Sequence, residues 1–120
     1  MALYVDGFLL AVPKKNLAAY TRMAKLGAKV WMDHGALEYR ECLGDDLAVK
    51  GMTAFPVRVK AKPGETVVFS WIVFRSKADR DRINKKVMKD PRLAAMMDPK
   101  AMPFEMKRMS YGGFKVIVNG

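Results

Sequence analysis

Apolar residues alternate or cluster in four separate stretches of the chain, and each stretch predicts a β-strand. Side chains point alternately to the two faces of a strand, and β-branched and aromatic residues favour this conformation. The strongest signal is the segment TVVFSWIVF. The four predicted strands span residues 3–12, 37–43, 66–74 and 108–118. A weaker alternation at residues 57–61, followed by the turn sequence KPGE, predicts an additional short hairpin strand.

Two other segments show the 3.6-residue periodicity of amphipathic helices. In the first, Asn16 is a candidate N-cap and Gly35 follows the last turn. Its apolar stripe consists of Leu17, Tyr20, Ala24, Gly27, Trp31 and His34. In the second, Ser76 and Asp79 form an S-x-x-D capping box. The predicted helices cover residues 17–34, 77–89 and, as one short turn, 91–97.

The order of these elements is β-α-β-β-α-β once the hairpin strand is set aside. This is the split βαβ pattern of ferredoxin-like folds, in which helices cover one face of an antiparallel sheet. We therefore expect an α+β protein. No linker, repeat or low-complexity segment divides the chain, so residues 1–120 are predicted to form a single domain.

Both faces of the predicted sheet are apolar, although two helices can cover only one of them. In the strand at 66–74, one face carries Val67, Phe69, Trp71 and Val73, and the other carries Val68, Ser70, Ile72 and Phe74. Uncovered apolar faces of that size are unusual for monomers. We expect a homodimer in which the bare sheet faces meet around a twofold axis. The alternative is that residues 44–64 or 91–104 fold over the second face.

Charge and composition limit the kinds of partner, cellular compartment and cofactor that we expect for this chain. The chain carries 22 Lys and Arg against 12 Asp and Glu, a formal net charge of +10. This excess either attracts an anionic partner or simply keeps the surface solvated; without a nucleic-acid motif we expect only weak, non-specific nucleic-acid binding. The lone Cys42 cannot form an internal disulfide, and no apolar run spans a bilayer, so a cytoplasmic protein without membrane contact is predicted. Zinc-ligand spacings and nucleotide-binding motifs do not occur in the sequence, so we expect no metal and no cofactor.

Several motifs together resemble one known family. They are YVDGF (4–8), HGALEYRECLGDD (34–46), ETVVFSW (65–71), DPR (90–92) and MPFEMKRMSYGGF (102–114). In this order and over nearly the whole chain, they resemble the YbaA-like family of small bacterial proteins, a domain of unknown function. The resemblance implies the dimeric α/β-barrel superfamily, whose ferredoxin-like protomers pair sheet to sheet. Superfamily relatives include cofactor-free monooxygenases and haem-degrading enzymes, so the resemblance implies at most a cofactor-independent monooxygenase-like activity.

Asp6 is the first candidate for chemistry, because a carboxylate inside an apolar strand needs a partner. The first and last strands of a ferredoxin-like sheet are neighbours, which makes Arg108, Lys107 and Tyr111 candidate partners. We hypothesise that Asp6, Trp71, Arg108 and Tyr111 lie in one neighbourhood and that His34 lies at its rim. Asp6 paired with Arg108 would be structural, whereas Asp6 unpaired beside Trp71 would be a candidate general base.

Glu41 and His34 are the other candidates. Glu41 lies in the second predicted strand, where it is a candidate ligand-binding residue together with Asp6, Trp71, Arg108 and Tyr111. His34, the only histidine, is a candidate catalytic base or haem ligand, or it complements the dipole at a helix end.

Two functions remain open from the sequence. The first is a homodimer that binds a small organic ligand, aromatic in part, between its sheet and helices. The alternative is a non-catalytic basic protein whose cationic helices contact RNA or another acidic partner. An aromatic residue interleaved with the basic ones, as stacking on single strands requires, is not evident in the sequence.

Overall fold

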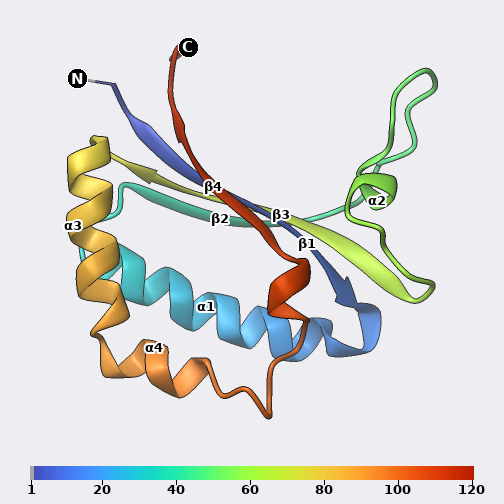
Figure 1. Ribbon diagram of the computed structural model, residues 1–120, viewed down its shortest axis with the longest axis horizontal. Helices are drawn as coiled ribbons and strands as arrows, with labels where there is room; N and C mark the ends of the chain where they lie inside the picture. The colour runs from blue at the N-terminus through green and yellow to red at the C-terminus, as the bar shows by residue number, and fades with distance from the viewer. Residues whose placement is uncertain (1) are drawn as a thin grey trace.

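The computed structural model describes residues 2–120 and contains a four-stranded sheet with helices packed on it (Figure 1). The strands are β1 (Tyr4–Pro13), β2 (Glu38–Leu43), β3 (Glu65–Phe74) and β4 (Ser110–Lys115). The helices are α1 (Leu17–Asp33), α2 (Phe55–Arg58), α3 (Lys77–Met88) and α4 (Pro91–Met96). Short 3-10 turns at Lys14–Asn16 and Met106–Arg108 precede α1 and β4. The four main strands and three helical segments predicted from the sequence are all present.

The sheet has the strand order β2-β3-β1-β4, and every neighbouring pair is antiparallel. This confirms the ferredoxin-like α+β fold. The additional hairpin strand predicted at 57–61 is wrong, because that region contains the short helix α2 and a following turn. Pro56 lies in the first turn of α2, where its fixed φ suits a helix and its missing N–H costs nothing, and Ala61 N donates to the Pro56 carbonyl at 2.9 Å.

Local signals set the helix ends as expected. The Ser76 hydroxyl accepts a hydrogen bond from the Asp79 backbone N–H at 3.1 Å, which confirms the predicted N-cap of α3. Gly35 follows α1 with a φ of 112°, a left-handed conformation that favours glycine. Asn16 precedes α1, but its side chain donates to the Pro103 carbonyl at 3.0 Å and does not cap the helix.

The core lies between the sheet and the helices α1, α3 and α4, which Figure 1 shows on the same side of the sheet. Even-numbered residues of β1 and β3 point into it. The fully buried side chains include Leu10, Val12, Val30, Phe74, Ile83 and Val87. Burial of each such side chain contributes roughly 1.5–3 kcal/mol, so this side of the sheet carries most of the stability of the fold.

The opposite face of the sheet, here called the open face, is apolar and carries no covering layer along most of its length. It includes Val5, Leu9, Phe69, Trp71, Val73 and Phe114, which line a hollow of about 800 Å³. The α4 segment packs on α1, on the other side of the sheet. The α2 segment reaches one end of the open face, where the rings of Phe55 and Phe69 are 6.2 Å apart. The alternative that residues 44–64 or 91–104 fold over this face is therefore wrong for most of its area.

The double glycine of β4 makes room for side chains and does not form a bulge. Gly112 and Gly113 pair in regular register with Gly7 and Asp6. A Cβ on Gly113 would lie 2.5 Å from the Tyr4 hydroxyl oxygen and 2.7 Å from an Arg80 guanidinium nitrogen. The glycine thus lets Tyr4 and Arg80 cross the edge of the sheet next to Asp6.

Candidate functional site

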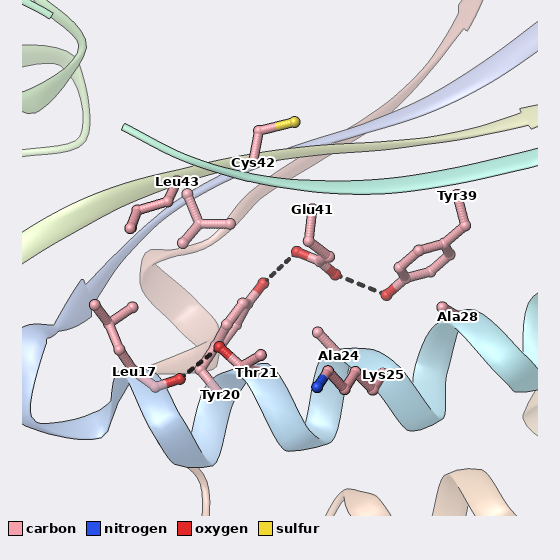
Figure 2. Close-up of a pocket in the computed structure, with 11 residues that line it drawn as sticks. Leu17, Tyr20, Thr21, Ala24, Lys25, Ala28, Tyr39, Glu41, Cys42 and Leu43 are labelled. Carbon is pink, nitrogen blue, oxygen red and sulfur yellow. Dashed lines mark hydrogen bonds between the residues drawn. The ribbon is translucent and has the colours of Figure 1, made fainter. Parts of the chain in front are cut away.

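A cavity of about 350 Å³ lies between α1 and β2, and its wall combines apolar side chains with one carboxylate and two phenols (Figure 2). Glu41 projects from β2 toward α1, between Tyr39 of the same strand and Tyr20 of the helix. The apolar part of the wall includes Leu17, Ala24, Ala28, Leu43 and Val68. This cavity, here called the Glu41 cavity, is the candidate site.

Both oxygens of Glu41 accept a phenolic hydrogen bond. The Tyr20 hydroxyl donates to Oε1 at 2.7 Å, and the Tyr39 hydroxyl donates to Oε2 at 2.7 Å. Burial raises the pKa of both phenols above the ordinary value, and the nearby negative charge of Glu41 raises it further. Tyr20 and Tyr39 therefore remain protonated donors, and the carboxylate is held in one orientation.

The sequence builds this arrangement from two periodicities. Tyr39 and Glu41 are two residues apart in β2, so both side chains point to the helix face. Tyr20, Ala24 and Gly27 recur on the buried stripe of α1. The helix residues opposite the polar groups are small, and a Cβ on Gly27 would lie only 3.1 Å from the Tyr39 hydroxyl. Small residues on α1 thus leave the space that the phenol and the cavity occupy.

Asp6 forms a second polar group, which is buried, and each of its two carboxylate oxygens accepts a hydrogen bond. Its side chain is 1% exposed. Arg80 Nε donates to Oδ1 at 2.9 Å, and Asn84 Nδ2 donates to Oδ2 at 3.0 Å. Asn84 Oδ1 in turn accepts from Trp31 Nε1 at 3.0 Å. These contacts tie β1 to α3 and, through Asn84, to α1, so both donors to Asp6 come from α3.

The pairing of Asp6 with Arg108, one of the alternatives left open by the sequence, does not form. Arg108 donates to both oxygens of Glu65, at 2.7 and 2.8 Å, and to the Lys60 carbonyl at 3.1 Å. These bonds from Arg108, together with the Lys62 backbone N–H, lower the pKa of Glu65 to about 2. Arg108 lies in the 3-10 turn before β4, whereas the β4 residue opposite Asp6 is Gly113. It therefore anchors the turn before β4 to the start of β3.

The hypothesised neighbourhood of four residues does not form as a unit. Tyr111 does lie near Asp6: Arg80 bridges them by donating to the Tyr111 hydroxyl at 3.0 Å. Trp71, in contrast, is on the open face, because it pairs with Gly7 while Asp6 pairs with Ile72. A one-residue step along a strand reverses the face, so the sheet itself separates Trp71 from Asp6.

His34 also lies apart from Asp6. Its Nε2 is 2.8 Å from Asp90 Oδ2, at the junction of α1 and α4. Arg92 donates to the same carboxylate, and Arg92 and His34 lower the pKa of Asp90 below its usual range. This cluster connects the end of α1 to α4, and His34 does not contribute to the Glu41 cavity.

Sequence reasoning selected Glu41 but missed Tyr20 and Tyr39. Tyr20 belongs to the predicted apolar stripe of its helix, and Tyr39 precedes Glu41 by two residues in the same predicted strand. The available signal was that two tyrosines faced an acidic residue across the predicted helix–strand contact. Within residues 2–120, no group of three or more His, Cys, Asp or Glu side chains is arranged to hold a metal ion. None of the helices in this range is long and apolar enough to cross a membrane.

The comparisons with solved structures concern the fold. A NIPSNAP family protein of unknown function from Agrobacterium tumefaciens superposes with a TM-score of 0.58 at 15% identity, over 96% of this chain and 87% of that protein. An uncharacterised NIPSNAP domain protein from Burkholderia xenovorans gives a TM-score of 0.55 at 11% identity, over 92% and 91% of the two chains. A dimeric ferredoxin-like protein from an uncultured marine organism gives 0.53 at 9% identity over 100% of both chains. At these identities the likeness establishes the shared fold.

Sequence relatives identify the family. The uncharacterised protein YbaA of Escherichia coli K12 is 45% identical over 116 residues, which is 97% of each chain. YbaA of Shigella flexneri matches to the same extent. The model of the family described as "Protein of unknown function (DUF1428)" matches residues 3–106. The chain therefore belongs to the DUF1428 family.

Proposed function

We propose that the protein is a homodimer that binds a small organic ligand in the Glu41 cavity of each protomer. The observation that carries the proposal is the cavity itself, in which a carboxylate and two phenols converge at one side of an otherwise apolar wall. Ligand sites typically combine an apolar lining with a few positioned polar groups, and a volume of about 350 Å³ is at the lower end of their usual range. The ligand is accordingly small.

The arrangement of Glu41 supports binding more strongly than a purely structural role. The hydrogen bonds from Tyr20 and Tyr39 fix the carboxylate before any ligand arrives, which reduces the ordering cost of binding. The neighbouring apolar side chains offer surface to the body of the ligand. Asp6 lacks this character, because it is almost fully buried, its charge is paired with Arg80, and it does not line the cavity.

The open face supports the dimer. Phe69 is 44% exposed and Phe114 is 61% exposed, although both lie on an apolar sheet surface with Val5, Trp71 and Val73. An apolar patch of this extent is normally covered, and a second copy presents the same apolar surface. The marine protein with the same fold is described as dimeric, which supports the same arrangement here.

The ligand part is tested by screening a library of fragments with protein-detected NMR. We expect bound fragments to shift the amide resonances of Tyr20, Ala24 and Glu41. Ala28→Phe should abolish these shifts by filling the cavity, whereas Ala18→Phe, on the exposed side of α1, should leave them unchanged. A library in which no fragment shifts these resonances would refute the ligand part.

The dimer part is tested by light scattering after gel filtration. We expect a mass of twice the 13.5 kDa of the chain. Phe69→Asp should give a folded monomer, because the charge is tolerated at a half-exposed position but would be buried unpaired in the dimer, at a cost of several kcal/mol. Met88→Asp, an equivalent change at a 65% exposed position of α3, should remain dimeric. A wild-type monomer at micromolar concentration would refute this part.

A further inference from the structure

The polar groups of the Glu41 cavity define the chemistry of its ligand, provided that the cavity binds one as proposed above. The hydroxyl hydrogens of Tyr20 and Tyr39 are both directed to Glu41, and that of Thr21 is directed to the Leu17 carbonyl at 2.8 Å. These side chains have therefore no hydrogen left to donate. They still offer unused lone pairs on two phenolic oxygens, one hydroxyl oxygen and the carboxylate.

Glu41 also lacks a positive partner. The other Asp and Glu side chains that are not exposed each form an ion pair with an arginine, as in Asp6–Arg80, Glu65–Arg108 and Asp90–Arg92. The acids without an ion pair in residues 2–120 are Glu41 and the exposed Asp45, Asp46 and Asp98. Lys25 lines the cavity but forms no ion pair with Glu41. In a chain with ten more basic than acidic side chains, a partly buried carboxylate without a cation is a distinctive feature.

We infer that the Glu41 cavity binds a primary ammonium group carried on a small apolar body, such as an alkylamine or arylalkylamine. An ammonium has three donors and no acceptor, which complements the acceptor oxygens of Glu41, Tyr20 and Tyr39. Its charge is neutralised by Glu41, and charge-assisted hydrogen bonds are roughly twice as strong as neutral ones. Leu17 and Val68 provide apolar surface for the rest of the molecule.

The overall charge of the protein sharpens this inference. A chain with a net charge of +10 repels organic cations at long range and attracts anions. A preference for an amine over a matched anion therefore has to arise locally, at a site such as the Glu41 cavity. Non-specific electrostatics would produce the opposite preference.

The test uses three probes of the same size and shape: 2-phenylethylamine, 2-phenylethanol and phenylacetate. Their affinities for the full-length wild-type protein are measured at pH 7 by NMR titration, with the amides of Tyr20 and Tyr39 as reporters. We expect the amine to bind at least tenfold more tightly than the alcohol, and phenylacetate to bind most weakly. Glu41→Gln should remove the preference for the amine. Glu38→Gln, which removes the same charge from the same strand but on the open face, should retain it.

The outcomes separate this inference from the proposed function. If the alcohol or phenylacetate binds at the reporters as tightly as the amine does, the ammonium inference is overturned while a ligand site at the cavity stands. If the amine binds but shifts resonances elsewhere, or keeps its affinity in Glu41→Gln, the inference is also overturned. If no fragment of any charge binds at the reporters, the proposed function itself fails. The comparison among probes is made on the wild-type protein, so it remains decisive even if Glu41→Gln does not fold.

Discussion

Replacing Asp6 by asparagine tests whether the buried Asp6 group is structural, and the hydrogen bonds allow the effect to be worked out. Arg80 and Asn84 each donate to one oxygen of Asp6, and the Asn84 carbonyl oxygen accepts from Trp31. In Asp6→Asn, one oxygen becomes an NH2 group. If that group faces Asn84, two donors oppose each other. If the Asn84 amide rotates to accept from it, the Trp31 N–H loses its acceptor.

If the NH2 group faces Arg80 instead, it opposes the Nε–H donor. One buried donor is therefore unsatisfied in every orientation, which costs about 1–3 kcal/mol. Arg80 also loses one of its two charged partners, while Asp81 and Tyr111 still accept from it. We expect a total destabilisation of roughly 3 kcal/mol, at the lower end of the cost of breaking a buried ion pair, because Asp81 still neutralises Arg80. For a chain of 120 residues the unfolding entropy is about 0.25 kcal/mol/K, so the melting temperature should fall by about 12 °C.

Urea and thermal unfolding of a double-mutant cycle provide the assay. Trp31→Phe removes the N–H that keeps Asn84 in place, so it should relieve part of the effect of Asp6→Asn. We expect the double variant to be about 1–2 kcal/mol more stable than the sum of the single effects predicts. The reasoning fails if Asp6→Asn is as stable as the wild type, or if the two effects simply add. A stable Asp6→Asn that has lost ligand binding would instead make Asp6 a functional residue.

Three further expectations concern the Glu65–Arg108 ion pair, the double glycine of β4 and the binding of RNA. Arg108 holds the pKa of Glu65 at about 2, below its ordinary 4.5, so this ion pair stabilises the fold above pH 4.5 and its contribution is lost as the pH falls toward 2. Glu65→Gln should therefore make stability, measured by circular dichroism, less dependent on pH over that range. An unchanged pH dependence of unfolding would contradict this. Gly113→Ala should destabilise the protein by about 1–3 kcal/mol, because its Cβ would meet Tyr4 and Arg80. Gly112→Ala, whose Cβ would lie 3.8 Å from the Phe114 ring, should be much milder, and equal urea midpoints would contradict this expectation. Binding to a mixed RNA pool, followed by fluorescence anisotropy at ~150 mM salt, should be weaker than about 1 μM and should decrease steeply with salt; tight, sequence-dependent binding would favour the RNA alternative.

The fold was predictable because its signals are local and agree with one another. The alternation in β3, the capping box at Ser76 and the periodic stripe of α1 each specify an element, and their order specifies the topology. The error at 57–61 arose because a short alternation was given more weight than Pro56, which begins a helical turn. A pattern of five residues is too short to distinguish a strand from one turn of helix.

The polar contacts were less predictable, because they depend on which of several charged residues reaches a given partner. Sequence order indicated that β1 and β4 are neighbours, but the partner of Asp6 is Arg80, which extends from α3 across the edge at Gly113. A long arginine side chain can be anchored on any neighbouring element, so strand pairing alone does not select it. The prediction for Trp71 was wrong for a simpler reason. Asp6 lies opposite Ile72, and Trp71, the residue before Ile72, points to the other face of the sheet.

The alternation of side chains along each strand also separates the two proposed binding surfaces, the Glu41 cavity and the open face. Glu41 and Cys42 are consecutive residues of β2, yet Glu41 points toward α1 while Cys42 points to the opposite side of the strand (Figure 2). The Glu41 cavity and the open face thus share strands but are lined by different side chains. A charge placed at Phe69 should therefore separate the protomers without changing the hydrogen bonds to Glu41. Glu41→Gln should alter the ligand preference without changing the mass of the oligomer in solution. If Phe69→Asp also weakened the binding of a fragment at the cavity, the dimer would have to position β2 against α1, and the sheet would connect the two surfaces that its side-chain pattern separates.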